Sequence, residues 1–98
     1  MIPKFPLRKV IAVDFDGTLF GNGVINEKVV AFCREKKAAG FEMILWSARG
    51  RELCVKAVKE FGLEGIFDHV ISKPGYILDD AGWTWIKFTR VIKSPTDV

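Results

Sequence analysis

The chain of 98 residues contains one histidine, two cysteines and no apolar run of membrane-spanning length. A transmembrane helix needs about 20 mostly apolar residues, so no membrane association is expected. The segment before Val10 holds two prolines and no apolar stretch of signal-peptide length, so export is not expected either. Cys33 and Cys54 fall at apolar positions of helical patterns, which favours buried, reduced thiols in a cytoplasmic protein over a disulfide. With His69 as the one histidine, a zinc site is also disfavoured.

The composition predicts one folded domain over residues 1–98. This length is close to the smallest that buries a useful core without disulfides, and 49% of the residues are hydrophobic, with no repeat or linker between them. The net charge is +3, but four of the twelve acids stand in two tight pairs, which leaves eight acids against fifteen bases elsewhere. Such a basic surface suits a polyanionic partner, although surplus lysines also keep small proteins soluble.

Apolar runs alternate with helical patterns along the chain. Lys9–Phe15 and Phe41–Ser47 are continuous apolar runs, typical of buried parallel strands. Asn26 can cap a helix that Gly40 ends, and Arg51–Phe61 has the apolar spacing of a second helix. This alternation predicts an α/β fold: a compact, Rossmann-like, mostly parallel sheet with helices on both faces and no cap domain.

The remaining segments are predicted from weaker patterns. Asp16–Ile25 is rich in Gly and Asn and is expected to be a loop. His69–Ser72 and Tyr76–Asp79 are expected to be short extended pieces. The stretch from Trp83 has Trp85, Phe88 and Ile92 at helical spacing, so we expect a helix there despite its β-branched residues.

Polar side chains stand where the predicted strands end. Asp14 and Asp16 end the first strand, Ser47 ends the second, and Asp79 and Asp80 end another. Sites in open parallel sheets lie off the carboxyl ends of the strands. Four carboxylates meeting there would repel one another unless a cation neutralised them. Because oxygen ligands favour a hard cation, the sequence predicts a Mg²⁺ site at this edge.

The spacing of Asp14 and Asp16 suits phosphoryl transfer. Residues i and i+2 of a strand point to the same side, so two carboxyls can flank one substrate. One can attack phosphorus while the other protonates the leaving oxygen and later activates water. Gly17 allows a sharp turn after the pair, and Thr18 offers a hydroxyl and an amide that can stabilise this turn.

Three motifs make the sequence resemble the haloacid dehalogenase superfamily of phosphotransferases. They are DFDGTLF at Asp14–Phe20, LWSAR at Leu45–Arg49 and ILDD at Ile77–Asp80. The resemblance runs from Val10 to about Asp80, which is most of the chain. Three motifs in this order after predicted strands are far more specific than the first motif alone.

The resemblance implies roles for individual residues. Asp14 is the implied nucleophile that becomes an aspartyl-phosphate, and Asp16 is the implied general acid and base, with its backbone carbonyl in the magnesium shell. Ser47 is expected to bind the transferring phosphoryl oxygens. Asp80, with Asp79 beside it, matches the metal ligand of the last motif.

Gly17 and Thr18, in the first motif, and basic residues near the motifs are candidates for phosphate contact. Lys73, in SKPG, matches the lysine that the superfamily normally supplies. However, only the three residues 73–75 separate the extended segments His69–Ser72 and Tyr76–Asp79. A connection between parallel strands needs about a dozen residues. Either His69–Ser72 is not a full parallel strand, or the usual intervening segment has been deleted. If Lys73 does not reach the site, Arg49 or a lysine of a partner subunit is the expected substitute. Arg49 and Arg51, just after Ser47, are either phosphate contacts or solvated residues at a helix start.

The predicted function is magnesium-dependent hydrolysis of a phosphomonoester through an aspartyl-phosphate. The substrate class stays open between a nucleotide, a nucleic-acid end and a phosphoprotein. The sequence has no inserted lid, which suggests a large substrate or a homo-oligomer whose neighbour covers the site. Trp83 and Trp85 fit such an interface, although core packing is favoured for them. One alternative is a shortened, catalytically weak or inactive relative that acts as a metal- and phosphate-binding or regulatory protein. The other is a dehalogenase, which the acids at 79–80 disfavour.

Overall fold

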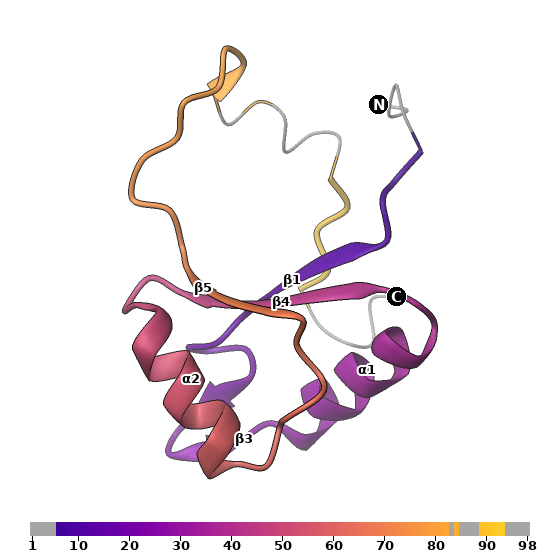
Figure 1. The fold of residues 1–98 in the computed structure, drawn as a ribbon, viewed down its shortest axis with the longest axis vertical. Coiled ribbons are helices and arrows are strands. Elements are labelled where there is room, and N and C mark those ends of the chain that lie inside the picture. The colour runs from indigo at the N-terminus through magenta and orange to yellow at the C-terminus, as the bar shows by residue number, and fades with distance from the viewer. Residues whose placement is uncertain (1–5, 83, 85–88, 94–98) are drawn as a thin grey trace.

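A three-stranded parallel sheet in the order β1-β4-β5 organises the fold (Figure 1). The computed structural model describes residues 6–82, 84 and 89–93. Strand β1 covers Val10–Asp14, β4 covers Glu42–Ser47 and β5 covers His69–Ser72. The two strands predicted from apolar runs are therefore confirmed, and so is the extended piece that follows the second helix.

Two helices connect these strands. Helix α1 covers Glu27–Ala38 and α2 covers Arg51–Glu60. The Asn26 side chain caps α1 as predicted, because its Oδ1 accepts hydrogen bonds from the backbone N–H groups of the second and third helical residues at 3.1 and 3.3 Å. Gly40 follows the helix with φ +90°, a conformation that favours glycine. Within the described residues, neither helix is long and apolar enough to cross a membrane.

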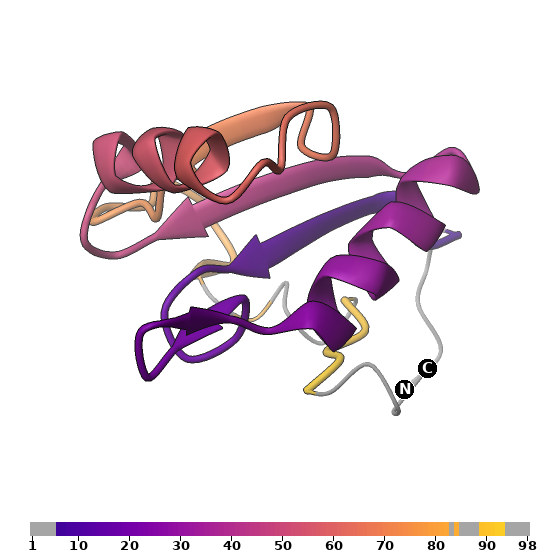
Figure 2. The same ribbon diagram turned by 90° about the horizontal axis from the view of Figure 1, so that it is seen from below.

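Both helices lie on the same face of the sheet (Figures 1 and 2). The prediction of helices on both faces is therefore wrong for the described helices. The chain steps from β1 to β4 to β5 in one direction across the sheet. The usual right-handed sense of strand–helix–strand connections then puts both helices on one side. Alternate strand residues Val13, Met43 and Leu45 are buried, whereas Val10 and Ile71 of the opposite parity are exposed.

The core lies between the sheet and the two helices. Both cysteines belong to it and both are free, which confirms the prediction of buried, reduced thiols. Burial raises the pKa of the Cys33 thiol to about 11. The buried apolar residues form one cluster: Val13, Phe15, Leu19, Val29, Val30, Cys33, Met43, Leu45, Cys54, Ala57, Leu63 and Ile66.

A small antiparallel hairpin interrupts the segment Asp16–Ile25, which the sequence predicted to be a plain loop. Its strands are β2, Phe20–Gly21, and β3, Val24–Ile25. The two residues between them, Asn22 and Gly23, have φ values of 54° and 79°. Positive φ at both central residues is what a tight two-residue hairpin requires, and Asn-Gly is its strongest sequence signal. The loop prediction overlooked this signal.

Beyond β5 the described residues form no further strand. Tyr76–Asp79 is unpaired, and Tyr76 and Leu78 are almost fully exposed. The prediction of an extended strand there is wrong, because the three residues that separate this segment from β5 are too few for a parallel crossover. The predicted helix from Trp83 falls mostly outside the described residues, and residues 89–93 contain no helix or strand.

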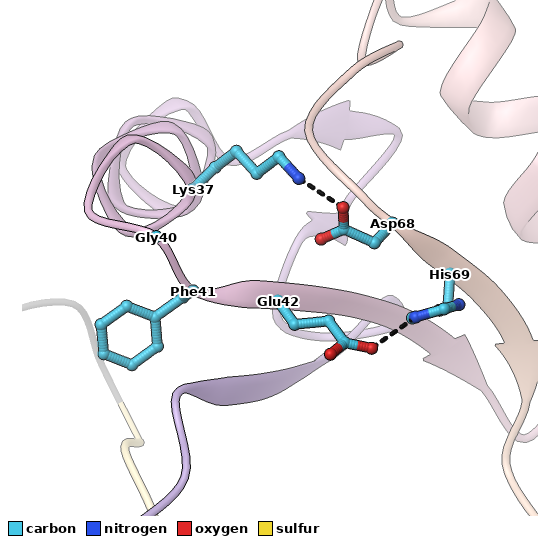
Figure 3. A pocket seen from close by; sticks show the side chains of 6 residues that line it. All are labelled: Lys37, Gly40, Phe41, Glu42, Asp68 and His69. Atoms are coloured by element: carbon cyan, nitrogen blue, oxygen red, sulfur yellow. Dashed lines mark hydrogen bonds and ion pairs between the residues drawn. The ribbon is translucent and has the colours of Figure 1, made fainter.

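Asp68 ties the end of α1 to the start of β4. Its carboxylate forms an ion pair with Lys37 of α1 and accepts a hydrogen bond from the backbone N–H of Met43 at 2.7 Å. Beside it, His69 Nε2 lies 2.5 Å from Glu42 Oε2. These side chains line a surface hollow of about 440 Å³ at the amino ends of β4 and β5 (Figure 3). Since its charged groups pair with one another, we assign this hollow a structural role.

Shortening a core side chain should destabilise the protein far more than shortening an exposed one. We expect Leu45→Ala to lower the free energy of unfolding by about 2–5 kcal/mol, because Leu45 is fully buried. The matched control, Leu78→Ala, removes the same atoms from an exposed side chain and should cost less than about 0.5 kcal/mol. Urea unfolding measures both values. Similar losses in the two variants would show that Leu78 is packed, contrary to the structure.

The Asp68 carboxylate should make stability depend on pH in the acid range. The hydrogen bond from Lys37, and then that from Met43 N–H, hold the pKa of Asp68 below its ordinary value of 3.8. Its contribution is therefore complete above pH 3.8 and is lost as the pH falls through the lower, folded-state pKa. The other ionisable groups close by are His69 and Glu42, which pair with each other.

Asp68→Asn tests this contribution. We expect the variant to have a lower urea midpoint at neutral pH and a shallower loss of stability below pH 3.8 than the native protein. Lys37→Met removes the main cause of the lowered pKa, so its stability should also fall less steeply with decreasing pH below 3.8. An equal loss of stability below pH 3.8 in the native protein and Asp68→Asn would contradict this assignment.

Candidate active site

The carboxyl ends of the three strands bring predicted site residues to one edge of the sheet. Asp14 is the last residue of β1, Ser47 the last of β4, and Lys73 directly follows β5. The backbone N–H of Lys73 donates to the carbonyl of Ser47 at 2.9 Å. This is the edge at which open parallel sheets hold their ligands.

Lys73 reaches the predicted nucleophile. Its Nζ lies 3.0 Å from Asp14 Oδ1, so neither Arg49 nor a partner subunit is needed to bring a basic group to Asp14. His69–Ser72 is a full parallel strand, so it delivers the following lysine to the same edge as Asp14. The ammonium also lies 5.9 Å from the ring centroid of Trp46. Trp46 is a neighbour that sequence reasoning missed, although its place directly before Ser47 put it opposite Asp14.

Asp16, Ser47 and Arg49 form a second cluster beside this pair. The buried Ser47 hydroxyl donates to Asp16 Oδ2 at 3.0 Å and accepts from the backbone N–H of Arg49, also at 3.0 Å. The Arg49 guanidinium donates from Nε to Asp16 Oδ2 at 3.0 Å and from Nη2 to Oδ1 at 2.5 Å. Both oxygens of Asp16 are therefore engaged, in the bidentate geometry that strengthens an arginine–carboxylate pair.

This cluster favours the ionised form of Asp16. The hydrogen bonds from Arg49 lower its pKa most, Ser47 and the charge of Lys73 lower it further, and partial burial opposes them. The same contact raises the pKa of Arg49. The side chains of Arg49 and Asp16 are 59% and 39% exposed, so water weakens the attraction between them. In this arrangement Asp16 accepts hydrogen bonds and is not set to donate a proton.

The turn after β1 holds the two aspartates on either side of a buried anchor. Phe15 is in the core, and its neighbours Asp14 and Asp16 remain partly exposed. Gly17 follows with φ +81°, which costs about 1–2 kcal/mol for a residue with a Cβ atom. The Thr18 hydroxyl donates to Asp14 Oδ2 at 3.3 Å. Gly17 and Thr18 thus stand at the turn where the sequence placed them.

Asp79 and Asp80 are not brought to this edge. Asp79 Oδ1 accepts a hydrogen bond from the N–H of Ala81 at 2.8 Å, a local turn contact. Among the residues that the structure describes, no three His, Cys, Asp or Glu side chains gather as a metal site would require. The predicted four-carboxylate site is therefore not assembled. Its last two members depended on the strand at 76–79, which does not form.

The donor set at the edge does not fit a preformed magnesium cage. Its carboxylates are Asp14 and Asp16, and each is paired with a basic side chain, Lys73 or Arg49. Proteins commonly hold Mg²⁺ through one or two carboxylates together with substrate phosphate oxygens and water. Asp14 and Asp16 could be the carboxylate ligands of such an ion only when Lys73 and Arg49 bind another anion, such as a phosphate, in their place.

The sequence did not predict that Ser72 and Cys54 lie near the site. Ser72 Oγ accepts a hydrogen bond from the N–H of Arg51 at 2.8 Å, which ties the end of β5 to the start of α2. Cys54 of α2 is buried, and burial together with the negative charges of Asp16 and Asp14 raises its pKa. Cys54 therefore lies close to both carboxylates as a neutral thiol. Its helical position predicted its burial but not these neighbours.

The hairpin adds a hollow next to the aspartates. It has a volume of about 300 Å³ and is lined by Gly17, Thr18, Phe20, Gly21, Asn22, Val24 and Asn26. The hollow of about 440 Å³ at the amino ends of the strands contains none of the residues at this edge. We therefore place the candidate site at the carboxyl ends of the strands, where the reactive side chains lie, and not in the hollow of greater volume.

Comparison of this chain with protein-family models, with curated proteins and with solved structures found no match. The interpretation of this edge of the sheet therefore depends on its own residues and their geometry.

Proposed function

We propose that this chain hydrolyses a phosphomonoester, with Asp14 as the nucleophile. The observation that carries the proposal is the 3.0 Å contact between Lys73 Nζ and Asp14 Oδ1 at the carboxyl ends of the strands. It places an ammonium group beside the carboxylate that would attack. Ser47 and Arg49, whose hydrogens suit phosphoryl oxygens, lie at the same edge.

The proposed reaction has two steps. The Asp16 carboxylate first takes up a proton from solvent. An oxygen of Asp14 then forms a bond to phosphorus while the ester oxygen leaves and takes this proton from Asp16. Water, deprotonated by Asp16, then attacks phosphorus and releases phosphate and the Asp14 carboxylate. The Asp14 side chain is 33% exposed, so a substrate can approach it. Lys73 is positioned to stabilise the charge on the transferring phosphoryl group.

Charge balance supports binding of magnesium together with the substrate rather than to the free site. The side chains of Asp14, Asp16, Lys73 and Arg49 form two ion pairs and carry no net charge together. A phosphomonoester dianion adds two negative charges to this neutral site. Bound Mg²⁺ would neutralise the added charge and polarise the phosphoryl group.

The resemblance to the haloacid dehalogenase superfamily gives the finer details of the proposal. The chain would be a capless, Rossmann-like core that acts in the cytoplasm on a phosphorylated nucleotide or macromolecule. The surplus of basic residues outside the acidic pairs supports a polyanionic substrate. A homo-oligomer whose neighbour covers the open site is part of the same proposal.

A non-catalytic phosphate-binding protein is the second candidate function. It is favoured by the position of Asp79 and Asp80 away from the site and by the engagement of Asp16 with Arg49. Beryllium fluoride with magnesium, which imitates an aspartyl-phosphate, separates the candidates when combined with an activity assay. Thermal stabilisation without turnover on a broad panel of phosphate esters would favour the binding protein.

Replacing the nucleophile should abolish turnover. We expect the native chain to hydrolyse an aryl phosphate only with magnesium, and Asp14→Asn to lower kcat by at least about 10³-fold. The measurement is release of the aryl alcohol, with and without magnesium, by both proteins at matched concentration. Equal activity of the two proteins would exclude Asp14 as the nucleophile.

Removing the ammonium group beside Asp14 should also slow the reaction. We expect Lys73→Met to lower kcat/KM by about 10²-fold, the usual effect of losing one donor that stabilises the transition state. Lys59→Met is the matched control, because Lys59 lies in the last turn of α2 and is exposed. The control should retain native activity. If both variants retain it, the Lys73–Asp14 contact has no part in catalysis.

A further inference from the structure

Arg49 binds the Asp16 carboxylate, which the proposed reaction needs as its general acid. Its guanidinium donates to both oxygens of Asp16, and the Ser47 hydroxyl donates to one of them. A general acid must lie within hydrogen-bond reach of the leaving oxygen and must carry the proton that it transfers. The Asp16 carboxylate cannot meet that requirement while its oxygens accept hydrogen bonds from Arg49.

The backbone of Arg49 is fixed by hydrogen bonds to Ser47, whereas its side chain is held by the exposed pair with Asp16. Its N–H donates to the buried Ser47 hydroxyl at 3.0 Å, and the next N–H, of Gly50, donates to the Ser47 carbonyl at 3.2 Å. The Arg49 side chain is 59% exposed, so water weakens its bidentate attraction to Asp16. The guanidinium can therefore leave Asp16 by rotation about side-chain bonds, with no change in the sheet.

A phosphoryl group is a suitable second partner for this side chain. Two phosphoryl oxygens accept the same parallel pair of N–H donors as a carboxylate does. The Asp16–Arg49 pair stands at the edge where Lys73 contacts Asp14, and the charge of Lys73 acts on Asp16, so a phosphate held there is a near neighbour of Arg49. A phosphomonoester dianion also carries more charge than the carboxylate it would displace.

We infer that Arg49 is an exchangeable positioning residue, which holds Asp16 in the substrate-free protein and moves to the phosphoryl oxygens when substrate binds. This inference rests on the proposed function. The exchange frees Asp16 to take up a proton from solvent, and so to transfer it, only once a phosphate is present. It also makes the site selective, because the incoming group must compete with a carboxylate for the guanidinium. A terminal phosphomonoester dianion competes better than a singly charged phosphodiester.

A double-mutant cycle on phosphate binding tests the exchange. Inorganic phosphate is titrated calorimetrically, in the presence of magnesium, into the native chain, Asp16→Asn, Arg49→Gln and the double variant. Because Asp16 competes for Arg49, we expect Asp16→Asn to bind phosphate about 3- to 5-fold more tightly than the native chain. In the Arg49→Gln background the same substitution should give little or no gain. Urea midpoints of the four proteins establish that each is folded.

The cycle separates exchange from simple repulsion. If Asp16→Asn gives the same gain in both backgrounds, Asp16 only repels phosphate and the exchange is overturned. No gain in either background overturns it as well. Neither of these results affects the proposed function if the native chain binds phosphate and hydrolyses the aryl phosphate. Absence of both binding and hydrolysis in the native chain would instead overturn the proposed function.

The side-chain resonance of Arg49 gives an independent measurement. In ¹⁵N-labelled protein the Arg49 Nε–H signal, assigned by its loss in Arg49→Gln, should move when inorganic phosphate is added. The matched variant Arg51→Gln identifies the signal of the neighbouring exposed arginine at the start of α2. A signal of Arg49 that stays fixed while phosphate binds would contradict the exchange.

Discussion

The parallel pairing of β4 with both of its neighbours is the constraint on which the site depends. Asp14 lies opposite Trp46, and Ser47 lies opposite Ser72, so three strands end at nearly the same level. The residues at or just after those ends then meet without long loops to position them. The buried side chains of β4 fix this register, because a shift by one residue would turn its apolar side chains away from the helices.

The site is built from two ion pairs of different character. Lys73 reaches Asp14 through a single contact of 3.0 Å, whereas Arg49 grips both oxygens of Asp16. The other oxygen of Asp14 has a longer contact, from the Thr18 hydroxyl at 3.3 Å, whereas Arg49 binds Asp16 in a bidentate geometry. In the proposed mechanism Asp14 attacks phosphorus, and Arg49 holds Asp16 until a substrate binds. The fully buried Ser47 links the two pairs, because its hydroxyl donates to Asp16 and its carbonyl accepts from the backbone N–H of Lys73.

Local rules predicted the helices and the first two strands well. The Asn26 cap and the apolar runs that became β1 and β4 are readable because each depends on a few neighbouring residues. The one-sided placement of the helices was missed, because it depends on the direction in which the chain crosses the sheet. The hairpin was missed although Asn22–Gly23 signalled it, since the segment was judged by its overall composition.

The candidate site was predictable only where the strands carry it. Asp14, Asp16 and Ser47 follow strands that the sequence identified, and they do meet at one edge. The reach of Lys73 depended on whether β5 forms, which four residues of weak pattern could not decide. The contact of Arg49 with Asp16 joins residues 33 positions apart, so no local pattern encodes it. The predicted contributions of Asp79 and Asp80 assumed a strand that the short connection after β5 rules out.

The two buried cysteines are internal probes of local opening in the molecule. Thiol reagents attack the thiolate, and burial raises the pKa of both Cys33 and Cys54 while hiding their sulfur atoms. Each thiol can therefore react only when its surroundings open. Since one lies in α1 and the other in α2 beside the aspartates, their separate rates of modification report how often each helix lifts from the sheet. A ligand that stabilises the carboxyl ends of the strands would slow the modification of Cys54 and leave that of Cys33 unchanged.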